Sequence, residues 1–507
     1  MKRREIIKLL GAVAAGAEGL RLSAPVFAQA PRDTITVAQA SDAQTMDPGR
    51  HTHFPTANVL FHIFDALVTV DEDGRFHPAL AESWSNPDPL TWQFKLRRGV
   101  RFHNGEEFNA DAVKFSFDRV LNREFRSPML ARISHIRSVD VVDPYTVNFV
   151  TAAPFPTMLF SVVEASFATL IMPPRYTRET APEVLARQPI GTGPYRFVEW
   201  RRDDRVVLEA NQDYWGGAPR IRRAVWRPVS ETRTRIAELR SGGVDLAGDI
   251  PPEEVASLNR APTKVVDVAS EALFFFGFET LRPSPLQDRR VRQAMHYAID
   301  VDAIQRAIMG GYGQRIAVTL PRTAFGYPQD MQPYPYDPAR ARALLAEAGH
   351  ANGFALPLTA RQGRYLKDRE VMEACFGYLA RVGIRVEARY LEQSVWAQVS
   401  ERRGREGLIF GGWSGMDADL VWYPLLYTGQ FQSYYSNPQL DALLDRGRTT
   451  VDQDERLRIY RQAADIIKDD APLLPLFQPP LIYGLNARLN WRPRSDTMIN
   501  LRGATFA

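Results

Sequence analysis

The segment PALAESWSNPDPLTWQFKLRRGVRFHNGEEFNADAVKFSFDR, residues 78–119, has the clearest local pattern in the chain. Residues 92–96 alternate apolar and polar side chains, which predicts a half-buried strand, and residues 100–102 repeat the alternation. Asn104-Gly105 favours a tight turn. Asn109 is placed to cap a helix whose apolar residues share one face, namely Val113, Phe117, Val120 and Leu121. We therefore expect strand, strand, turn and helix, with no catalytic chemistry.

As a string, the same segment resembles the signature of one family, the solute-binding proteins of peptide/nickel-type ABC importers. The matching parts are residues 81–84 (AESW), 96–105 (LRRGVRFHNG) and 110–116 (ADAVKFS). Further landmarks of that family recur along the chain, at residues 191–195 (GTGPY), 211–215 (NQDYW), 291–294 (VRQA), 336–338 (YDP) and 470–472 (DAP). The resemblance covers nearly all of the chain after residue 30.

The resemblance implies an α/β fold with two lobes, a type II periplasmic binding protein of the large class with an extra β-rich subdomain. We place lobe I at residues 31–278 and 480–507, with the subdomain at 67–185, and lobe II at 279–479. Residues 273–278 form an apolar run suited to a strand buried on both faces. We expect the first passage between the lobes just after it, near Glu279, and the return after residue 477. Two passages make a hinge.

Several local signals predict the remaining elements. The chain should begin with a strand at residues 34–40, followed by a helix at 57–67. Four residues are expected to cap helices, namely Asp288, Asp337, Asn437 and Asp452. The last of these helices should bury Leu457, Tyr460, Ala464 and Ile467. Residues 321–338 contain five prolines and are expected to form an extended surface loop.

The charge balance argues against nucleic acid as a partner. The 507 residues carry a formal net charge of +4, of which residues 1–30 contribute +3. Residues 31–507 are therefore close to neutral, so their net charge gives no reason to expect binding to nucleic acid or to an anionic membrane. The one cysteine, Cys375, lies in a helical-looking run and is expected to be buried.

Residues 1–30 are typical of an export signal. Arg3-Arg4 precede a short apolar run at residues 6–17, which is too short to span a bilayer, and Ala28-Gln29-Ala30 suits cleavage after Ala30. The start resembles a twin-arginine signal but departs from it at Lys2 and Ile6, so ordinary secretion is the alternative. Because no cysteine lies near residue 30, we expect a periplasmic protein without a lipid anchor.

The glycine-rich stretch at residues 408–419 (LIFGGWSGMDAD) is the first candidate ligand site. Trp413 offers an apolar wall, and Asp417 or Asp419 offers a carboxylate with no Lys or Arg between residues 408 and 432. Such a pair suits a cationic group, for example a peptide's ammonium. The resemblance implies that Asp417, with Asp419 second, holds the ligand's amino terminus. Where the family usually has a proline this chain has Ala418 and Leu420, which leaves the choice of acid open.

Two other stretches are candidates through the resemblance. Residues 363–368 (GRYLKD) are similar to a Gly-Arg-Tyr-x-Lys-Asp stretch of glutathione- and dipeptide-type members. There, Arg364 would take a carboxylate through its two-pronged guanidinium, beside Tyr365. The loop that contains Thr45 and Met46 is expected at the mouth of the cleft, with a solvated turn as the alternative.

Other functions have weaker support. Five histidines fall within residues 51–103, and imidazole suits nickel, but no helical ligand spacing links them. A nickel or metal-chelate binder of the same family, or an opine- or glycoside-type binder, is the alternative. No sequence motif of a serine hydrolase or zinc protease occurs, so we expect no enzyme and no cofactor. The protein is expected to be a monomer that captures short peptides and delivers them to the permease and ATPase of an ABC importer.

Overall fold

The computed structural model describes residues 33–164, 170–361, 365–391 and 393–507. Its largest sheet has seven strands, in the order β12 (Thr263–Ala269), β20 (Pro480–Asn486), β11 (Leu246–Ala247), β1 (Thr34–Gln39), β10 (Arg223–Pro228), β9 (Arg205–Ala210) and β8 (Tyr195–Arg201). Strand β1 runs parallel to β10 and β11, and the other neighbours are antiparallel. The predicted first strand is confirmed, since β1 begins at Thr34.

A second sheet has five strands, in the order β16 (Ile384–Leu391), β15 (Phe354–Arg361), β17 (Leu408–Ser414), β13 (Ala272–Phe278) and β18 (Leu473–Pro475). Strand β13 lies between β17 and β18, and residues 273–278 are all buried. Its side chains alternate between two cores: Phe274 and Phe276 belong to one, Leu273 and Phe275 to the other. The apolar run is therefore a strand buried on both faces, as predicted.

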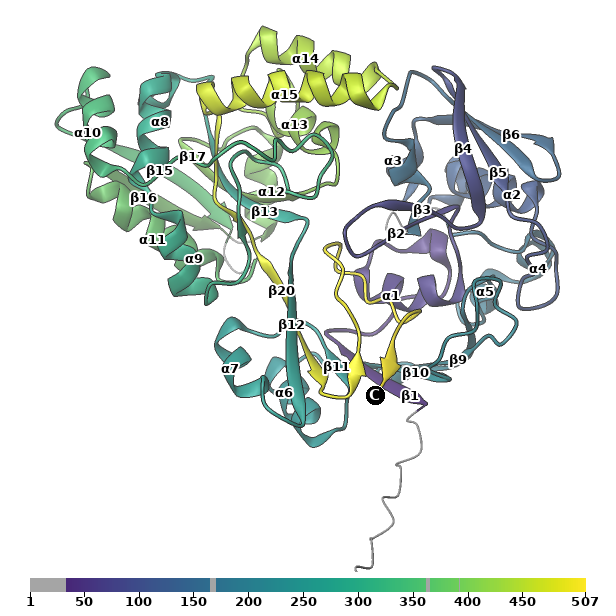
Figure 1. The fold of residues 1–507 in the computed structure, drawn as a ribbon. Helices are drawn as coiled ribbons and strands as arrows, with labels where there is room; N and C mark the ends of the chain where they lie inside the picture. Colours follow the sequence, from purple (N-terminus) through teal and green to yellow (C-terminus); the bar gives the residue numbers. More distant parts are fainter. Residues whose placement is uncertain (1–32, 165–169, 362–364, 392) are drawn as a thin grey trace, which may run out of the picture. The chain divides into compact units, whose positions relative to one another are not determined.

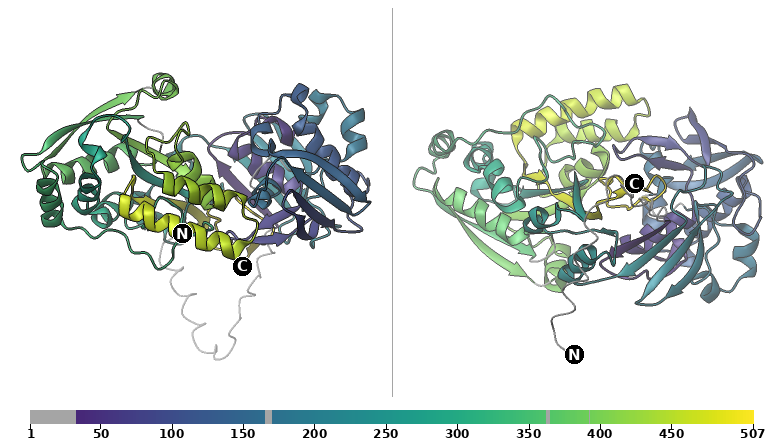
Figure 2. Two further views of the ribbon diagram at one scale, coloured as in Figure 1. Left: turned by 90° about the horizontal axis from the view of Figure 1, so that it is seen from above. Right: turned by 60° about the horizontal axis from the view of Figure 1, so that its bottom comes forward.

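Helices cover both faces of the five-stranded sheet. The core that contains Phe274 includes residues of α8 (Arg289–Ala298), α9 (Val301–Met309), α10 (Pro338–Glu347) and α11 (Asp368–Ala380). The core that contains Phe275 includes residues of α13 (Ala418–Leu426), α14 (Pro438–Thr449) and α15 (Gln453–Asp470). Helices α14 and α15 lie together in every view (Figures 1 and 2). The four predicted caps are confirmed, because each side chain accepts a hydrogen bond from its helix's first turn.

The chain passes between the two sheets at residues 270–271, between β12 and β13, and returns at residue 479, ahead of β20. The two passages are bonded to each other, since the Ser270 amide donates to the Pro479 carbonyl (3.0 Å) and the Gln478 side chain donates to the Ser270 carbonyl (2.6 Å). Strands β12 and β20 run side by side next to them (Figure 1). The predicted passage near Glu279 is one strand too late, since β13 belongs to the five-stranded sheet. A sequence buried on both faces of a strand does not indicate to which of the two sheets that strand belongs.

Within residues 67–185, a separate sheet has the order β4 (Ala81–Asp88), β5 (Thr91–Leu96), β7 (Thr146–Thr151) and β6 (Ile136–Asp143). Helix α2 (Ala110–Leu121) contacts β6 and β7, and the Asn109 side chain caps it. The predicted strand at residues 100–102 does not form. Val100 and Phe102 are buried, but only an isolated bridge joins Arg101 to Glu107. This sheet shares one continuous core with the seven-stranded sheet.

Helix α1 (Phe54–Ile63) lies earlier than the predicted 57–67, and its end packs against the turn at residues 191–195. The Gly193 amide donates to the Ile63 carbonyl (2.8 Å). The turn therefore serves to pack the end of α1. The predicted loop at 321–338 is only partly on the surface, since Ala324 and Tyr327 are buried. Cys375 is buried as expected.

A substitution at Gly191 tests this close packing. A Cβ atom there would lie 2.0 Å from the Ile63 carbonyl oxygen, which is backbone and has no freedom to rotate away. We expect Gly191→Ala to lower the free energy of unfolding by about 3 kcal/mol, measured by urea denaturation. Gly377→Ala in α11 is the control, because nothing lies within 4 Å of its added carbon. An equal loss in both variants would contradict the packing argument.

No helix in the described ranges combines the length and the apolar character needed to cross a bilayer.

Candidate functional site

Trp413, near the end of β17, packs against the core shared with α13. Its indole nitrogen donates to the Leu420 carbonyl (2.9 Å), which ties the glycine-rich turn to the start of α13. The ring lines a small cavity of about 140 Å³ within the part of the protein built on the five-stranded sheet. Trp413 therefore lines the smaller cavity and not the larger cavity described below.

Asp417 is not the uncompensated carboxylate that its neighbourhood in the sequence suggests. It is 1% exposed and caps α13 through a hydrogen bond from the Asp419 amide (2.9 Å). Nη2 of Arg456 on α15 lies 2.9 and 3.0 Å from its two carboxylate oxygens. Burial raises the pKa of the Asp417 carboxyl to about 6, and Arg456 opposes that rise. The carboxylate is thus balanced by a cation 39 residues further along the chain.

Asp419, the second candidate, is also balanced. It is buried, and Nε of Arg448 on α14 lies 3.7 Å from its Oδ1 atom. Burial raises the pKa of the Asp419 carboxyl, and the guanidinium opposes this. Neither acid lines the larger cavity, so both bind α13 to α14 and α15.

The other predicted residues are dispersed. Tyr365 lines the larger cavity, and its hydroxyl donates to the Gly412 carbonyl (3.3 Å). Arg364 lies outside the described residues. Met46 is fully buried in the core that the four-stranded and seven-stranded sheets share. The Thr45 hydroxyl accepts a hydrogen bond from the Asp47 amide (3.1 Å). The loop around Thr45 and Met46 does not line either cavity.

A cavity of about 760 Å³ is lined by elements of both large sheets. From the seven-stranded side come the end of β1, the start of α1 and the beginning of β20. From the five-stranded side come Phe274 on β13, Tyr365 before α11 and Ser414 at the end of β17. Both strand passages border it, at residues 270–272 and 479–480. The volume is in the range of sites that enclose small ligands.

The charged side chains of this cavity are acidic. Asp249, Glu271 and Asp496 line it, and none of the described residues that line it is Lys, Arg or His. Asp496 is neutralised by Arg494, which does not line the cavity and also bonds Glu164 (2.8 Å). Oε1 of Glu271 is buried and has no hydrogen-bond partner among the described residues. Burial and the charge of Asp496 raise the pKa of Glu271 to about 8.

The histidines at residues 51–103 are spread through the fold. His62 accepts from the Leu501 amide through Nε2 (3.0 Å), and His103 bonds the Gly193 carbonyl (2.9 Å). Burial lowers the pKa of His62 to about 3. Within the described ranges, no group of three or more His, Cys, Asp or Glu side chains is placed to hold a metal ion.

The sequence interpretation missed Glu271 and Asp496. Glu271 lies at a passage between the sheets, and Asp496 lies 225 residues later in the C-terminal segment. The sequence shows no motif around either residue. The one available signal is that Glu271 directly precedes a long apolar strand. This signal identifies Glu271 as a cavity residue only if the passage between the sheets is placed before β13.

Two α/β units joined by paired strand passages, with a ligand-sized cavity bordered by both, define a solute-binding protein that encloses a small molecule. The family model of bacterial extracellular solute-binding proteins, family 5, middle region, matches residues 75–435. The chain belongs to this family, whose members are the substrate-binding components of ABC importers.

Similar proteins agree with this assignment. The chain is 31% identical to the glutathione-binding protein GsiB of Pectobacterium atrosepticum, over 97% of each chain. Among solved structures, HbpA2 from Haemophilus parasuis is 25% identical with a TM-score of 0.85, covering 94% of this chain and 100% of that one. The periplasmic binding protein DppA from Helicobacter pylori, in complex with the peptide STSA, is 28% identical with a TM-score of 0.72, over 94% and 98%. The predicted type II periplasmic binding protein fold is confirmed.

Proposed function

We propose that this protein captures short peptides, or similar zwitterionic solutes, in the larger cavity and delivers them to the membrane permease of an ABC importer. The observation that carries this proposal is a cavity with three carboxylates and no basic side chain among its described lining residues. Such a lining suits a ligand with a free ammonium group. The names of two similar proteins, one a glutathione-binding protein and one bound to a peptide, point to the same class of ligand.

The proposed mechanism is reversible binding with no covalent step. The ligand would contact residues of both sheets and stabilise one arrangement of the two units through its higher affinity for that arrangement. The passages at residues 270–271 and 479 would serve as the hinge. The protein would act as a monomer without a cofactor, and the importer's ATPase would supply the energy for transport. Residues 1–30 would direct export to the periplasm and be removed after Ala30.

Glu271 is the proposed anchor of the ligand's ammonium group. Its Oε1 atom is buried beside the cavity and has no partner in the described part of the chain, whereas Arg494 already neutralises Asp496. A bound ammonium would supply the missing charge-assisted hydrogen bond. Glu271 would thus take the role that the sequence suggests for Asp417, whose carboxylate is already paired with Arg456.

Removing the charge of Glu271 tests the proposal. We expect Glu271→Gln to weaken the binding of a di- or tripeptide by about 10- to 100-fold in calorimetry, because a charge-assisted hydrogen bond is lost. An N-acetylated peptide, which lacks the ammonium group, should bind both proteins equally weakly. The wild-type affinity should rise as the pH increases toward 8, since Glu271 must lose its proton to bind a cation. The variant should lack that rise.

The matched control is Glu209→Gln, an exposed glutamate on β9. Its peptide affinity should equal that of the wild type. The proposal would be wrong if no peptide in a broad panel bound the wild type, or if acetylation of the amino terminus left the affinity unchanged.

A further inference from the structure

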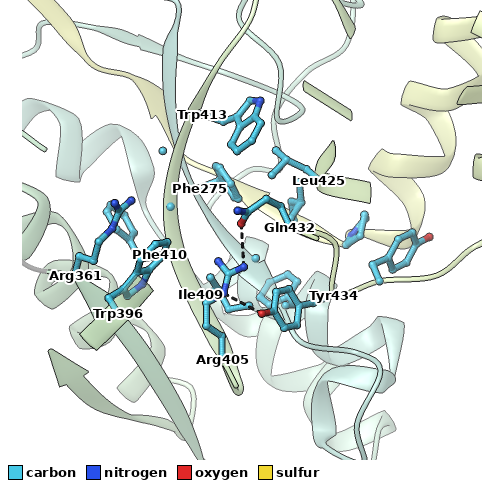
Figure 3. Close-up of a pocket in the computed structure, with 17 residues that line it drawn as sticks. Phe275, Arg361, Trp396, Arg405, Ile409, Phe410, Trp413, Leu425, Gln432 and Tyr434 are labelled. Atoms are coloured by element: carbon cyan, nitrogen blue, oxygen red, sulfur yellow. Dashed lines mark hydrogen bonds between the residues drawn. The ribbon is translucent and has the colours of Figure 1, made fainter. Parts of the chain in front are cut away.

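The smaller cavity, of about 140 Å³, lies among β13, β17, α12 (Gln393–Glu401) and the segment at residues 432–435. Most of its wall is apolar and comes from Phe275, Ile409, Phe410, Trp413 and Leu425. Figure 3 shows Arg405 beside this wall, bonded to Gln432 and Tyr434. The Arg405 guanidinium is thus a cation beside a largely apolar cavity.

Arg405 is 4% exposed, and its polar contacts are neutral. Its Nε donates to the Tyr434 hydroxyl (3.0 Å) and its Nη2 to Oε1 of Gln432 (2.9 Å). Within the described ranges, no carboxylate lies within 4.0 Å of its guanidinium, and its Nη1 has no hydrogen-bond partner. Four other arginines are buried to a similar degree. Arg292, Arg456 and Arg494 each pair with an aspartate, and Arg235 bonds two backbone carbonyls and the Thr232 hydroxyl.

The surroundings add positive charge. The Arg361 guanidinium lies over the Trp396 ring at 4.0 Å, and that of Arg405 lies 5.5 Å from the same ring. Burial, together with the charges of Arg361 and Arg403, lowers the pKa of Arg405. Burying a cation without a counter-charge costs several kcal/mol, so buried charges in proteins are normally paired. An anion in the cavity would offset that cost.

We propose that this cavity, the Arg405 pocket, binds a carboxylate group. A guanidinium matches a carboxylate through parallel hydrogen bonds, and the apolar wall fits a short methylene chain behind it. The carboxylate has two possible sources: an acidic side chain or terminus of the transported peptide, or a free small carboxylate such as acetate. The first source rests on the proposed function and makes acidic peptides the preferred ligands.

Neighbouring residues of β17 line the two cavities. Gly412 and Trp413 line the Arg405 pocket, whereas the next residue, Ser414, lines the larger cavity. Tyr365 lines the larger cavity and bonds Gly412 through its hydroxyl. If the carboxylate belongs to the transported peptide, a peptide held at its ammonium end by Glu271 would have to extend along β17 to bring its acidic group to Arg405.

The peptide arm of the test uses pairs of di- and tripeptides that differ only by Glu in place of Gln. We expect the wild type to bind the Glu member at least 10-fold more tightly in calorimetry. In Arg405→Met this ratio should fall to about 1 while the affinity for the Gln member is retained. Arg405→Lys keeps the positive charge but loses the pair of parallel hydrogen-bond donors. Its Glu/Gln affinity ratio should therefore lie between that of the wild type and that of Arg405→Met. Thermal melts establish which variants are folded.

The free-anion arm uses acetate against chloride at constant ionic strength, followed by tryptophan fluorescence, since Trp396 and Trp413 line the pocket. A saturable acetate response that disappears in Arg405→Met would identify a free carboxylate as the occupant. Arg385→Met, an exposed arginine on β16, is the control for both arms. An unchanged Glu/Gln ratio in both Arg405 variants, together with no Arg405-dependent acetate response, would overturn the proposal. If no peptide bound at all, the proposed function would fail and the acetate arm would decide this pocket alone.

Discussion

Replacing Arg456 with methionine should lower the free energy of unfolding by about 3–5 kcal/mol, the usual cost of breaking a buried ion pair from one side. Arg456 is 1% exposed, and its guanidinium bonds both oxygens of Asp417. It also donates through Nε to the Gly447 carbonyl (3.0 Å), so it joins the ends of α13, α14 and α15. Its loss would leave the Asp417 carboxylate buried without a counter-charge.

Urea denaturation followed by circular dichroism measures this loss. The double variant Asp417→Asn with Arg456→Met should recover part of it, because no charge then remains buried. Arg458→Met is the control: that side chain is 68% exposed and pairs with Glu455, so its loss should cost less than 1 kcal/mol. A loss below 1 kcal/mol for Arg456→Met would show that the pair contributes little to stability.

Replacing Arg494 with methionine should cost a similar amount, about 3–5 kcal/mol. Arg494 is 2% exposed and bonds two carboxylates, those of Glu164 and Asp496. Because Glu164 also accepts from the Thr69 hydroxyl (2.7 Å), the cluster joins the C-terminal segment to the chain near β2 (Val68–Val70). Without Arg494, the carboxylate of Asp496 would remain buried near Glu271, and Glu164 would keep only the more weakly interacting Arg502 as a nearby cation.

This second loss should depend on pH. In the wild type, Arg494 holds the pKa of Glu164 below its usual value against the opposing effect of burial. In the variant, the effect of burial on the pKa of Glu164 would be opposed less, so the folded state would bind more protons than it does in the wild type. The loss relative to the wild type would then be smallest below about pH 4, where Glu164 is protonated in both proteins, and would grow as the pH rises. Arg492→Met, exposed and two residues away, is the control. A loss independent of pH would contradict the electrostatic explanation.

Local structure was predictable wherever the determining residues are close in sequence. The alternation at residues 92–96, the Asn109 cap and the apolar run at 273–278 each specify an element through neighbours within a few positions, and each element forms. The prediction fails at residues 100–102, where the alternating pattern is present but no partner strand pairs with it. It also fails for Leu457, which is 44% exposed, while Arg456 takes the buried position beside it.

The amino-acid sequence by itself determined the fold class, the family and most helix caps, because these depend on short patterns and on a long string at fixed spacing. Only the tertiary structure decided which charges remain available to a ligand. Asp417 has no cation near it in sequence, yet Arg456 neutralises it from α15. Among the described residues, Glu271 keeps a buried carboxyl oxygen without a hydrogen-bond partner, and Arg405 keeps a buried guanidinium that no carboxylate contacts. Charge compensation acts over a few ångströms of space, and the chain brings those partners together from positions far apart in sequence.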